Sequence, residues 1–429
     1  WFGEEELQIL AKTFEDSDDW EGTKLVGIHN KEIINVLKKL SLFPYHVSDF
    51  EHITSVCHDE TYGIDKGIIV RNTCYPNWDN YEMIYNGPQF YISNPLYKKP
   101  RISCILNSDY DPIDLEKIND NYSSRTNYLP GLLLEEYKNL INGFDVGQSK
   151  DGDFTFECWM DYYKVGFRKM LSQAGERTLI CALLPRKSAH INGVISVAFR
   201  NGDYSVDMTA LCSSLVLDFY IKTVGASNLM PMRMRMLPLG IDKKYNSALR
   251  SRCLRLNCVT KRYADLWQEV WEPTYREETW SIEDNRLAKW DTLTEHWNHN
   301  TPLRNYFERR QTLLEIDVIA AMALGLTLDE LIMMYEIQFP VLQQNENDTW
   351  YDKNGRIVFT CSKGLVGVGV DRPTWNKIRD MKDGETYEHT LTSELYNGQT
   401  IIYEAPFTCC DRIQDYRTAW AHFEKIFNK

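Results

Sequence analysis

The sequence predicts an α+β protein with a mixed sheet, followed by a helical spacer and a small C-terminal α+β unit. Short apolar runs separated by Asn, Gly, Pro and Asp fill residues 46–106, a pattern typical of strands and turns. Helical and strand patterns alternate over residues 154–223, and helical patterns dominate from residue 246 to residue 340. A chain of 429 residues is also long enough to bury more than one core.

These patterns divide the chain into four expected segments. Residues 1–44 form an N-terminal helix-and-strand segment, and residues 45–245 form an α+β recognition domain. Residues 246–340 form the helical spacer, and residues 341–429 form the small C-terminal unit. Because the chain begins with Trp rather than Met, we expect it to be part of a longer polypeptide.

In the first half of the chain, apolar spacing predicts helices and short strands in turn. The expected helices span residues 4–14, 31–40, 132–141, 162–171 and 208–223, the last of them amphipathic. The expected strands span residues 24–28, 68–70, 90–92, 102–105, 178–184 and 191–199.

The second half carries clearer boundary signals. Thr301 followed by Pro302 predicts the start of a helix that ends before Gly325. Residues 327–330 read Thr-Leu-Asp-Glu, a capping box that predicts another helix. A strand over residues 356–360 and a final helix over residues 412–427 complete the expected order.

Composition excludes some classes of protein. The longest apolar runs are far shorter than the roughly 20 residues of a membrane-spanning helix, so we expect no membrane partner. The eleven cysteines show no spacing typical of a zinc site, which indicates reduced thiols, a cytoplasmic protein and no bound metal.

Several short motifs suggest catalysis but have simpler interpretations. Residues 94–97, Asn-Pro-Leu-Tyr, are similar to the Asn-Pro-Pro-Tyr element of amino-methyltransferases, yet no Gly-rich turn for the methyl donor precedes them, which favours a plain turn. Residues 364–369 resemble a dinucleotide turn without the strand and helix that such a turn needs. The acidic stretches at residues 15–21 and 114–117 lack the spacing of a nuclease site. We therefore assign no catalytic residue.

A basic segment stands out against the acidic chain, whose net charge is −13. Residues 222–262 contain ten basic side chains and one acidic side chain, a local charge of +9. Such a cluster can neutralise DNA phosphates, although a solvated helix face is the alternative. The candidate phosphate-binding residues are Lys222, Arg233, Arg235, Lys243, Lys244, Arg250, Arg252 and Arg255.

Residues suited to reading base edges occur in nearby loops and helices. Arginine and lysine pair with guanine, and asparagine pairs with adenine, in the major groove. The candidates are Arg168, Lys169, Arg186, Lys187, His190 and Asn192, together with Arg233 and Arg235.

The order of several motifs resembles the C-terminal region of large adenine-specific DNA methyltransferases from restriction-modification and phage-defence systems. They include Gly-Pro-Gln-Phe at 87–90, Asn-Pro-Leu-Tyr-Lys-Lys-Pro-Arg at 94–101 and Gly-Glu-Arg-Thr-Leu-Ile at 175–180. Further matches are Leu-Arg-Leu-Asn at 254–257 and Tyr-Asp-Lys-Asn-Gly-Arg at 351–356, so the resemblance spans nearly the whole chain. In such enzymes an upstream domain holds S-adenosylmethionine, and the C-terminal region reads DNA.

The resemblance implies a sequence-specific DNA recognition module without catalytic activity or cofactor of its own. The parent enzyme would use S-adenosylmethionine, and the partners would be double-stranded DNA and a missing methyltransferase domain, with or without a nuclease. A protein-interaction scaffold in a phage-defence complex, or a divergent nuclease or methyltransferase, remains the alternative.

Overall fold

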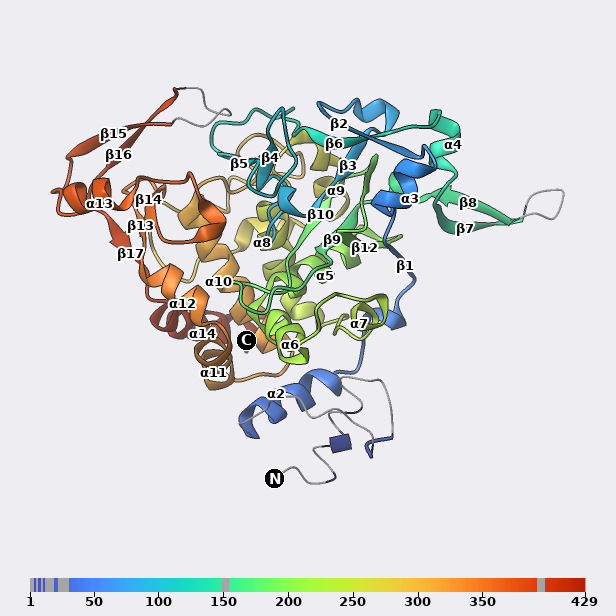
Figure 1. Ribbon diagram of the computed structural model, residues 1–429. Coiled ribbons are helices and arrows are strands. Elements are labelled where there is room, and N and C mark those ends of the chain that lie inside the picture. The colour runs from blue at the N-terminus through green and yellow to red at the C-terminus, as the bar shows by residue number, and fades with distance from the viewer. Residues whose placement is uncertain are drawn as a thin grey trace.

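The computed structural model describes residues 31–148, 154–391 and 398–428, together with residues 4, 7, 8, 11 and 19–21. Its described residues form an α+β structure, as predicted, in which a central sheet is surrounded by helices and by several small sheets (Figure 1). The predicted strand at 24–28 and most of the predicted helix at 4–14 and of the acidic stretch at 15–21 lie outside the described residues.

The described α-helices do not form one layer; they surround the central sheet. They are α2 (Lys31–Ser41), α3 (Glu60–Asp65), α4 (Leu134–Lys138), α5 (Gly202–Ser213), α6 (Leu215–Val224), α7 (Pro231–Arg235), α8 (Asn246–Asn257), α9 (Ala264–Glu269), α10 (Tyr306–Ala323), α11 (Leu328–Gln338), α12 (Pro340–Asn347), α13 (Arg372–Ile378) and α14 (Arg412–Phe427).

The central sheet has four antiparallel strands in the order β1-β12-β9-β10. Its strands are β1 (His52–Ser55), β9 (Lys164–Arg168), β10 (Cys181–Leu184) and β12 (Val194–Phe199). The mixed sheet that we predicted is absent here, and the parallel pairing among the described strands is that of β3 (Met83–Tyr85) with β11 (Ser188–His190).

The other strands form small antiparallel ladders, two of which project as hairpins at opposite sides of the molecule (Figure 1). The projecting pairs are β7 (Asn142–Gln148) with β8 (Phe154–Cys158), and β15 (Thr386–Thr390) with β16 (Thr400–Glu404). The remaining strands are β2 (Ile69–Cys74), β4 (Lys98–Pro100), β5 (Tyr110–Pro112), β6 (Thr126–Pro130), β13 (Thr349–Tyr351), β14 (Ile357–Thr360) and β17 (Thr408–Cys409).

Both faces of the central sheet are buried. In β12, Ile195, Val197 and Phe199 enter the largest apolar core, whereas Val194 and Ala198 enter two smaller cores on the other side. Because successive side chains of a strand point to opposite faces, β12 contributes to cores on both sides of the sheet, and β10 does the same through Cys181 and Leu183 on one face and Ala182 and Leu184 on the other. This explains why the sequences of β10 and β12 are nearly continuously apolar instead of alternating.

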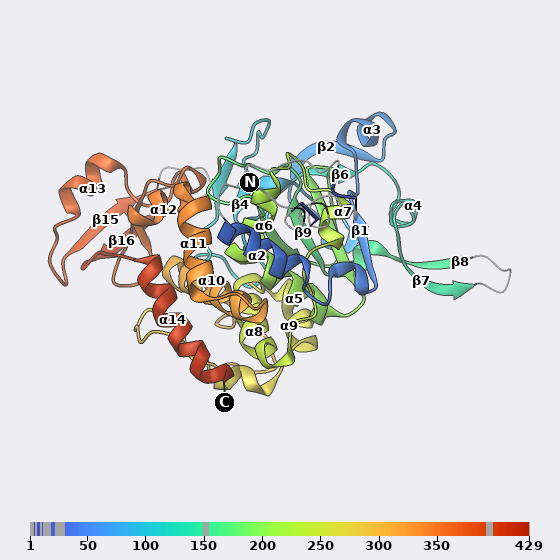
Figure 2. The same cartoon turned by 90° about the horizontal axis from the view of Figure 1, so that it is seen from below.

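The largest core also crosses the predicted segment boundaries. It joins Leu37 of α2, Val165 of β9, Leu254 of α8 and Leu314 of α10 with Phe423 of α14. Seen from below, α10, α11 and α14 lie beside one another and next to α6 and α8 (Figure 2). The predicted spacer at 246–340 is therefore part of this core, while the C-terminal unit adds a small core of its own around Trp375.

Several predicted elements differ from those observed. The predicted helix at 162–171 is strand β9, because Tyr163, Val165 and Phe167 alternate into the largest core. The single helix expected at 208–223 is two helices separated at Ser214, whose backbone is extended and whose hydroxyl caps α6. The segments at 90–92 and 102–105 are not strands.

Helix boundaries were predicted with mixed success. Helix α10 begins at Tyr306 instead of Pro302, because Asn305 caps it through the Glu308 amide. The capping box at 327–330 and the final helix are confirmed.

All eleven cysteines are free thiols, as expected. Among the described residues, no helix is long and apolar enough to cross a membrane.

Charged residues of α8 and α10 form buried ion pairs between these helices and their neighbours. Arg252 is fully buried and donates to Glu315 of α10 and to Glu278, at 2.8 Å in both cases. Arg250 binds both carboxylate oxygens of Asp207 on α5, at 2.6 and 2.8 Å. These pairs fix how the helices cross, because a buried charge that loses its partner is strongly destabilising.

We predict that Arg252→Ala lowers the free energy of unfolding by about 3–5 kcal/mol, because Glu315 would lose its buried counter-charge. The measurement is urea unfolding followed by tryptophan fluorescence. The exposed Lys425→Ala is the control and should change stability by less than about 0.5 kcal/mol. Equal effects of the two variants would contradict this role for Arg252.

Candidate functional site

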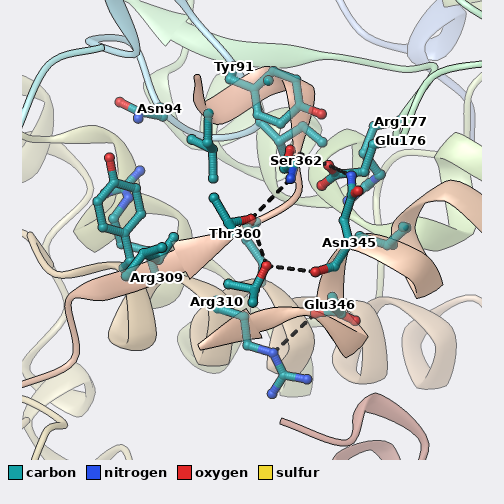
Figure 3. A pocket seen from close by; sticks show the side chains of 18 of the residues that line it. Tyr91, Asn94, Glu176, Arg177, Arg309, Arg310, Asn345, Glu346, Thr360 and Ser362 are labelled. Carbon is teal, nitrogen blue, oxygen red and sulfur yellow. Dashed lines mark hydrogen bonds and ion pairs between the residues drawn. The ribbon is translucent and has the colours of Figure 1, made fainter. Parts of the chain in front are cut away.

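A cavity of about 180 Å³ lies where four parts of the chain meet, one of them the segment with Glu176 and Arg177 (Figure 3). Tyr91, Asn94 and Tyr97 line it from the loop that precedes β4. Helix α10 contributes Arg309 and Arg310, and the C-terminal unit contributes a further wall. The C-terminal side chains are Asn345, Glu346, Thr349, Tyr351, Thr360 and Ser362.

A carboxyl group and an amide meet at one side of the cavity. Asn345 Nδ2 donates to Glu176 Oε2 at 2.6 Å, and Ser362 Oγ donates to the same oxygen at 3.0 Å. Burial raises the pKa of Glu176, although these two hydrogen bonds oppose the shift. The three residues come from the segment before β10, from α12 and from the loop after β14, so the site exists only in the folded chain.

Arginine side chains surround the cavity but are bound to the protein. Arg309 donates to the backbone carbonyls of Leu256, Leu303 and Ser93, each at 2.9 Å. Burial lowers its pKa to about 10, which still leaves it charged at neutral pH. Arg310 binds Glu346 and Asp415. These arginines therefore hold the cavity walls together.

Two stacked tyrosines form another side of the cavity. The rings of Tyr91 and Tyr97 lie 4.9 Å apart with an angle of 24° between their planes. The Tyr97 hydroxyl donates to the carbonyl of Gly364, in the loop after β14. Arg168 lies 5.3 Å from the Tyr91 ring and donates to the carbonyls of Gly87 and Phe90, at 2.8 and 2.6 Å. The side chain of this predicted base-reading residue thus supports the cavity instead.

Four predicted DNA-binding residues are buried, which corrects our expectation that they face a ligand. Arg250 and Arg252 are held in the ion pairs described above. Arg255 donates to the Thr301 carbonyl at 3.2 Å and lies 4.5 Å from the Trp290 ring. His190 is fully buried, with its Nε2 atom 2.8 Å from the Ser196 hydroxyl. The basic sequence pattern of α8 therefore reflects packing between helices, which the sequence alone does not distinguish from a surface patch.

Three other predicted residues are near the surface but already have partners. Arg186 lies 3.4 Å from Glu269, and Lys187 lies 3.0 Å from Asp79. Lys222 lies 5.1 Å from the Phe339 ring and donates to the Gly175 carbonyl at 3.4 Å.

The remaining predicted residues are accessible, and two of them meet. Lys169 Nζ donates to Asn192 Oδ1 at 2.6 Å, which brings the end of β9 to the turn before β12. Leu229 donates from its backbone to the Lys169 carbonyl at 2.8 Å, so the segment that leads into α7 lies alongside, and α7 itself carries Arg233 and Arg235. Arg235, Lys243 and Lys244 are exposed, and Arg233 is half-buried.

The short motifs that resemble catalytic elements in the sequence are mostly turns and loops in the structure. Asn94 Oδ1 accepts from the Leu96 amide at 3.1 Å, which is the turn that we favoured, although Asn94 also lines the cavity. Residues 364–369 lie in the loop between β14 and α13, so a strand and a helix do flank this motif, contrary to our expectation, but β14 pairs antiparallel and not in the parallel sheet of a dinucleotide-binding fold. Asp114 and Glu116 bind Arg356. Within the part of the chain that the structure describes, no three His, Cys, Asp or Glu side chains are grouped to hold a metal ion.

Sequence reasoning missed Glu176, Asn345 and Ser362, because they are single polar residues far apart in the chain. A scan against family models and a search of curated protein sequences found no match for this chain.

We predict that His190 makes stability depend on pH. Burial lowers its pKa to about 3, whereas an unfolded histidine titrates near pH 6.5. As pH falls from about 6.5 towards 3, the unfolded chain binds a proton that the folded chain excludes, so the folded state loses stability.

The variant His190→Gln should therefore reduce the slope of unfolding free energy against pH in this window by up to about 1.4 kcal/mol per pH unit. Chemical unfolding at a series of pH values measures this slope. The exposed His296→Gln serves as the control, and a slope that is the same in the wild type and His190→Gln would refute the assignment.

Proposed function

We propose that this chain is a sequence-specific DNA recognition module of an adenine-specific DNA methyltransferase or restriction-modification enzyme. The observation that carries the proposal is the meeting of Lys169 and Asn192, two of the residues that we selected from sequence as base readers. Lys169 follows β9 and Asn192 lies in the turn before β12, and the two partly exposed side chains meet at one edge of the sheet, as a recognition surface requires.

The geometry of this pair suits the edge of a base pair. An asparagine amide can bind adenine through two hydrogen bonds, and a lysine ammonium can bind guanine or a phosphate. Lys169 holds the Asn192 carbonyl oxygen and thereby orients the amide before DNA arrives. Preorientation lowers the entropic cost of binding.

Apolar side chains beside this pair add a second means of reading sequence. Met170, Met230 and Met232 are 77%, 51% and 62% exposed, and Met170 pairs through its backbone with Asn228. Apolar side chains discriminate thymine through its methyl group. We name the surface formed by Lys169, Met170, Asn192, Met230, Met232 and Arg235 the recognition surface.

The exposed cations supply the part of DNA binding that is independent of sequence. Arg235, Lys243 and Lys244 lie on and just after α7 and would contact phosphates. In the parent enzyme, the recognition surface would position one adenine for the missing methyltransferase domain, which would bind S-adenosylmethionine. This chain itself would supply neither the cofactor nor the reacting groups.

A protein-interaction scaffold is the second candidate, and the exposed methionines favour it. Methionine is flexible and polarizable, and it is common on surfaces that bind several partners. The salt dependence of DNA binding separates the two candidates, because only phosphate contacts release counterions.

We expect DNA binding to weaken steeply as salt rises. Replacing Lys169, Arg235, Lys243 and Lys244 with alanine should reduce the slope of log K against log salt by about 0.9 for each phosphate contact removed. Fluorescence anisotropy with a labelled duplex measures the slope. A control variant replaces four exposed lysines of the C-terminal part, Lys363, Lys377, Lys382 and Lys425. Lack of binding at low salt would favour the scaffold.

We further predict that Asn192→Ala relaxes sequence preference. Selection from a random duplex library should enrich one short adenine-containing motif with the wild-type chain. The variant should lose discrimination at one position of that motif, at a cost of about 1–3 kcal/mol. An identical motif with both proteins would show that Asn192 does not read a base.

A further inference from the structure

The cavity of Figure 3 has the size and chemistry of a site for one planar ligand. Its volume of about 180 Å³ exceeds the roughly 150 Å³ that accommodates a benzene ring in a protein interior, so it can hold a small flat ring system. We propose that it binds one purine nucleobase, held at its polar edge by Glu176 and Asn345 and beside the ring of Tyr91. This proposal does not depend on the recognition surface.

Two hydrogen-bond acceptors lie together on one wall. Glu176 Oε2 receives its hydrogen bonds from Asn345 and Ser362, whereas the described residues supply no donor to Oε1. Asn345 Oδ1 has only a weak contact with the Cys361 thiol at 3.6 Å. A purine amino group, alone or with an adjacent ring N–H, presents the donors that these two oxygens lack.

Tyrosine hydroxyls provide donors for the rest of such a ring. Tyr91, Tyr306 and Tyr351 line the cavity, and the described residues include no hydrogen-bond partner for their hydroxyl groups. Burial raises the pKa of all three, so they stay protonated at neutral pH. They can donate to ring nitrogens or to a carbonyl oxygen. The stack of Tyr91 on Tyr97 also makes Tyr91 a rigid aromatic surface.

The charges of the cavity favour a neutral ligand with N–H groups over a phosphate. Arg177 is paired with Asp218, and Arg412 is paired with Asp317 and Glu346. Arg310 is also paired with carboxylates, and Arg309 is bound by three carbonyls. The Nη2 group of Arg310 is buried without a hydrogen-bond partner in the described structure, but this guanidinium is already paired with two carboxylates, and Glu176 would repel a phosphate.

The test is isothermal titration of the full chain with adenosine, guanosine and cytidine. We expect saturable binding of a purine nucleoside, one per chain, and weaker binding of cytidine. Glu176→Gln should weaken it about tenfold or more, because a hydrogen bond to a charged group is lost. Glu388→Gln, a matched change at an exposed site on β15, should bind like the wild type.

A second variant separates binding from folding. Tyr91→Phe keeps the ring and removes only the hydroxyl, so it should fold normally and still bind less tightly. The thermal unfolding temperature of each variant, with and without nucleoside, reports folding and binding in one experiment. Absence of saturable purine binding by the wild type, or equal binding by the wild type, Glu176→Gln and Tyr91→Phe, would overturn the proposal.

Competition identifies the source of the base. A duplex with an unpaired purine opposite an abasic site should displace bound nucleoside if the base comes from DNA, whereas a fully paired duplex should displace it less. Failure of both duplexes to compete would assign the cavity to a free nucleobase or nucleoside. Since the nucleoside titration contains no DNA, its outcome is separate from that of the recognition surface.

Discussion

The fold depends on charges that are buried around α10 and paired with other elements. Glu315 of α10 binds Arg252 of α8, and Asp317 binds Arg412 of α14. Arg310 of the same helix binds Glu346 at the end of α12. Burial of an unpaired charge is far more costly than loss of an apolar contact, so these pairs permit few alternative arrangements of the helices.

This network explains the distribution of basic residues in the sequence. The segment at 222–262 combines two kinds of cation that look alike in sequence. Arg250, Arg252 and Arg255 neutralise or cap groups in the interior, and the exposed Arg235, Lys243 and Lys244 face solvent. Arginine suits the interior because its planar fork can satisfy two acceptors at once, as Arg250 does with Asp207. Only the second group is available to a partner.

The cavity and the recognition surface are linked by two consecutive residues at the end of β9. Arg168 supports the stacked Tyr91 and Tyr97, and Lys169 binds Asn192. The Lys169 amide also donates to the Gly193 carbonyl at 3.0 Å, which ties both sites to the rigid central sheet. A ligand in the cavity and a duplex on the recognition surface would thus both bind next to the same end of β9. This shared strand end offers a physical route by which binding at one site could change the affinity of the other.

The sequence by itself determined the features that depend on neighbouring residues. Apolar spacing and capping chemistry identified α2, α11 and α14 and the buried strands β10 and β12, because these signals act within a few residues. The tertiary structure decided that residues 162–171 contain a strand, that α8 turns its arginines inward, and that Glu176, Asn345 and Ser362 meet. Each of these outcomes depends on partners far away in the chain, such as Glu315 for Arg252, and burial against them outweighs local preference.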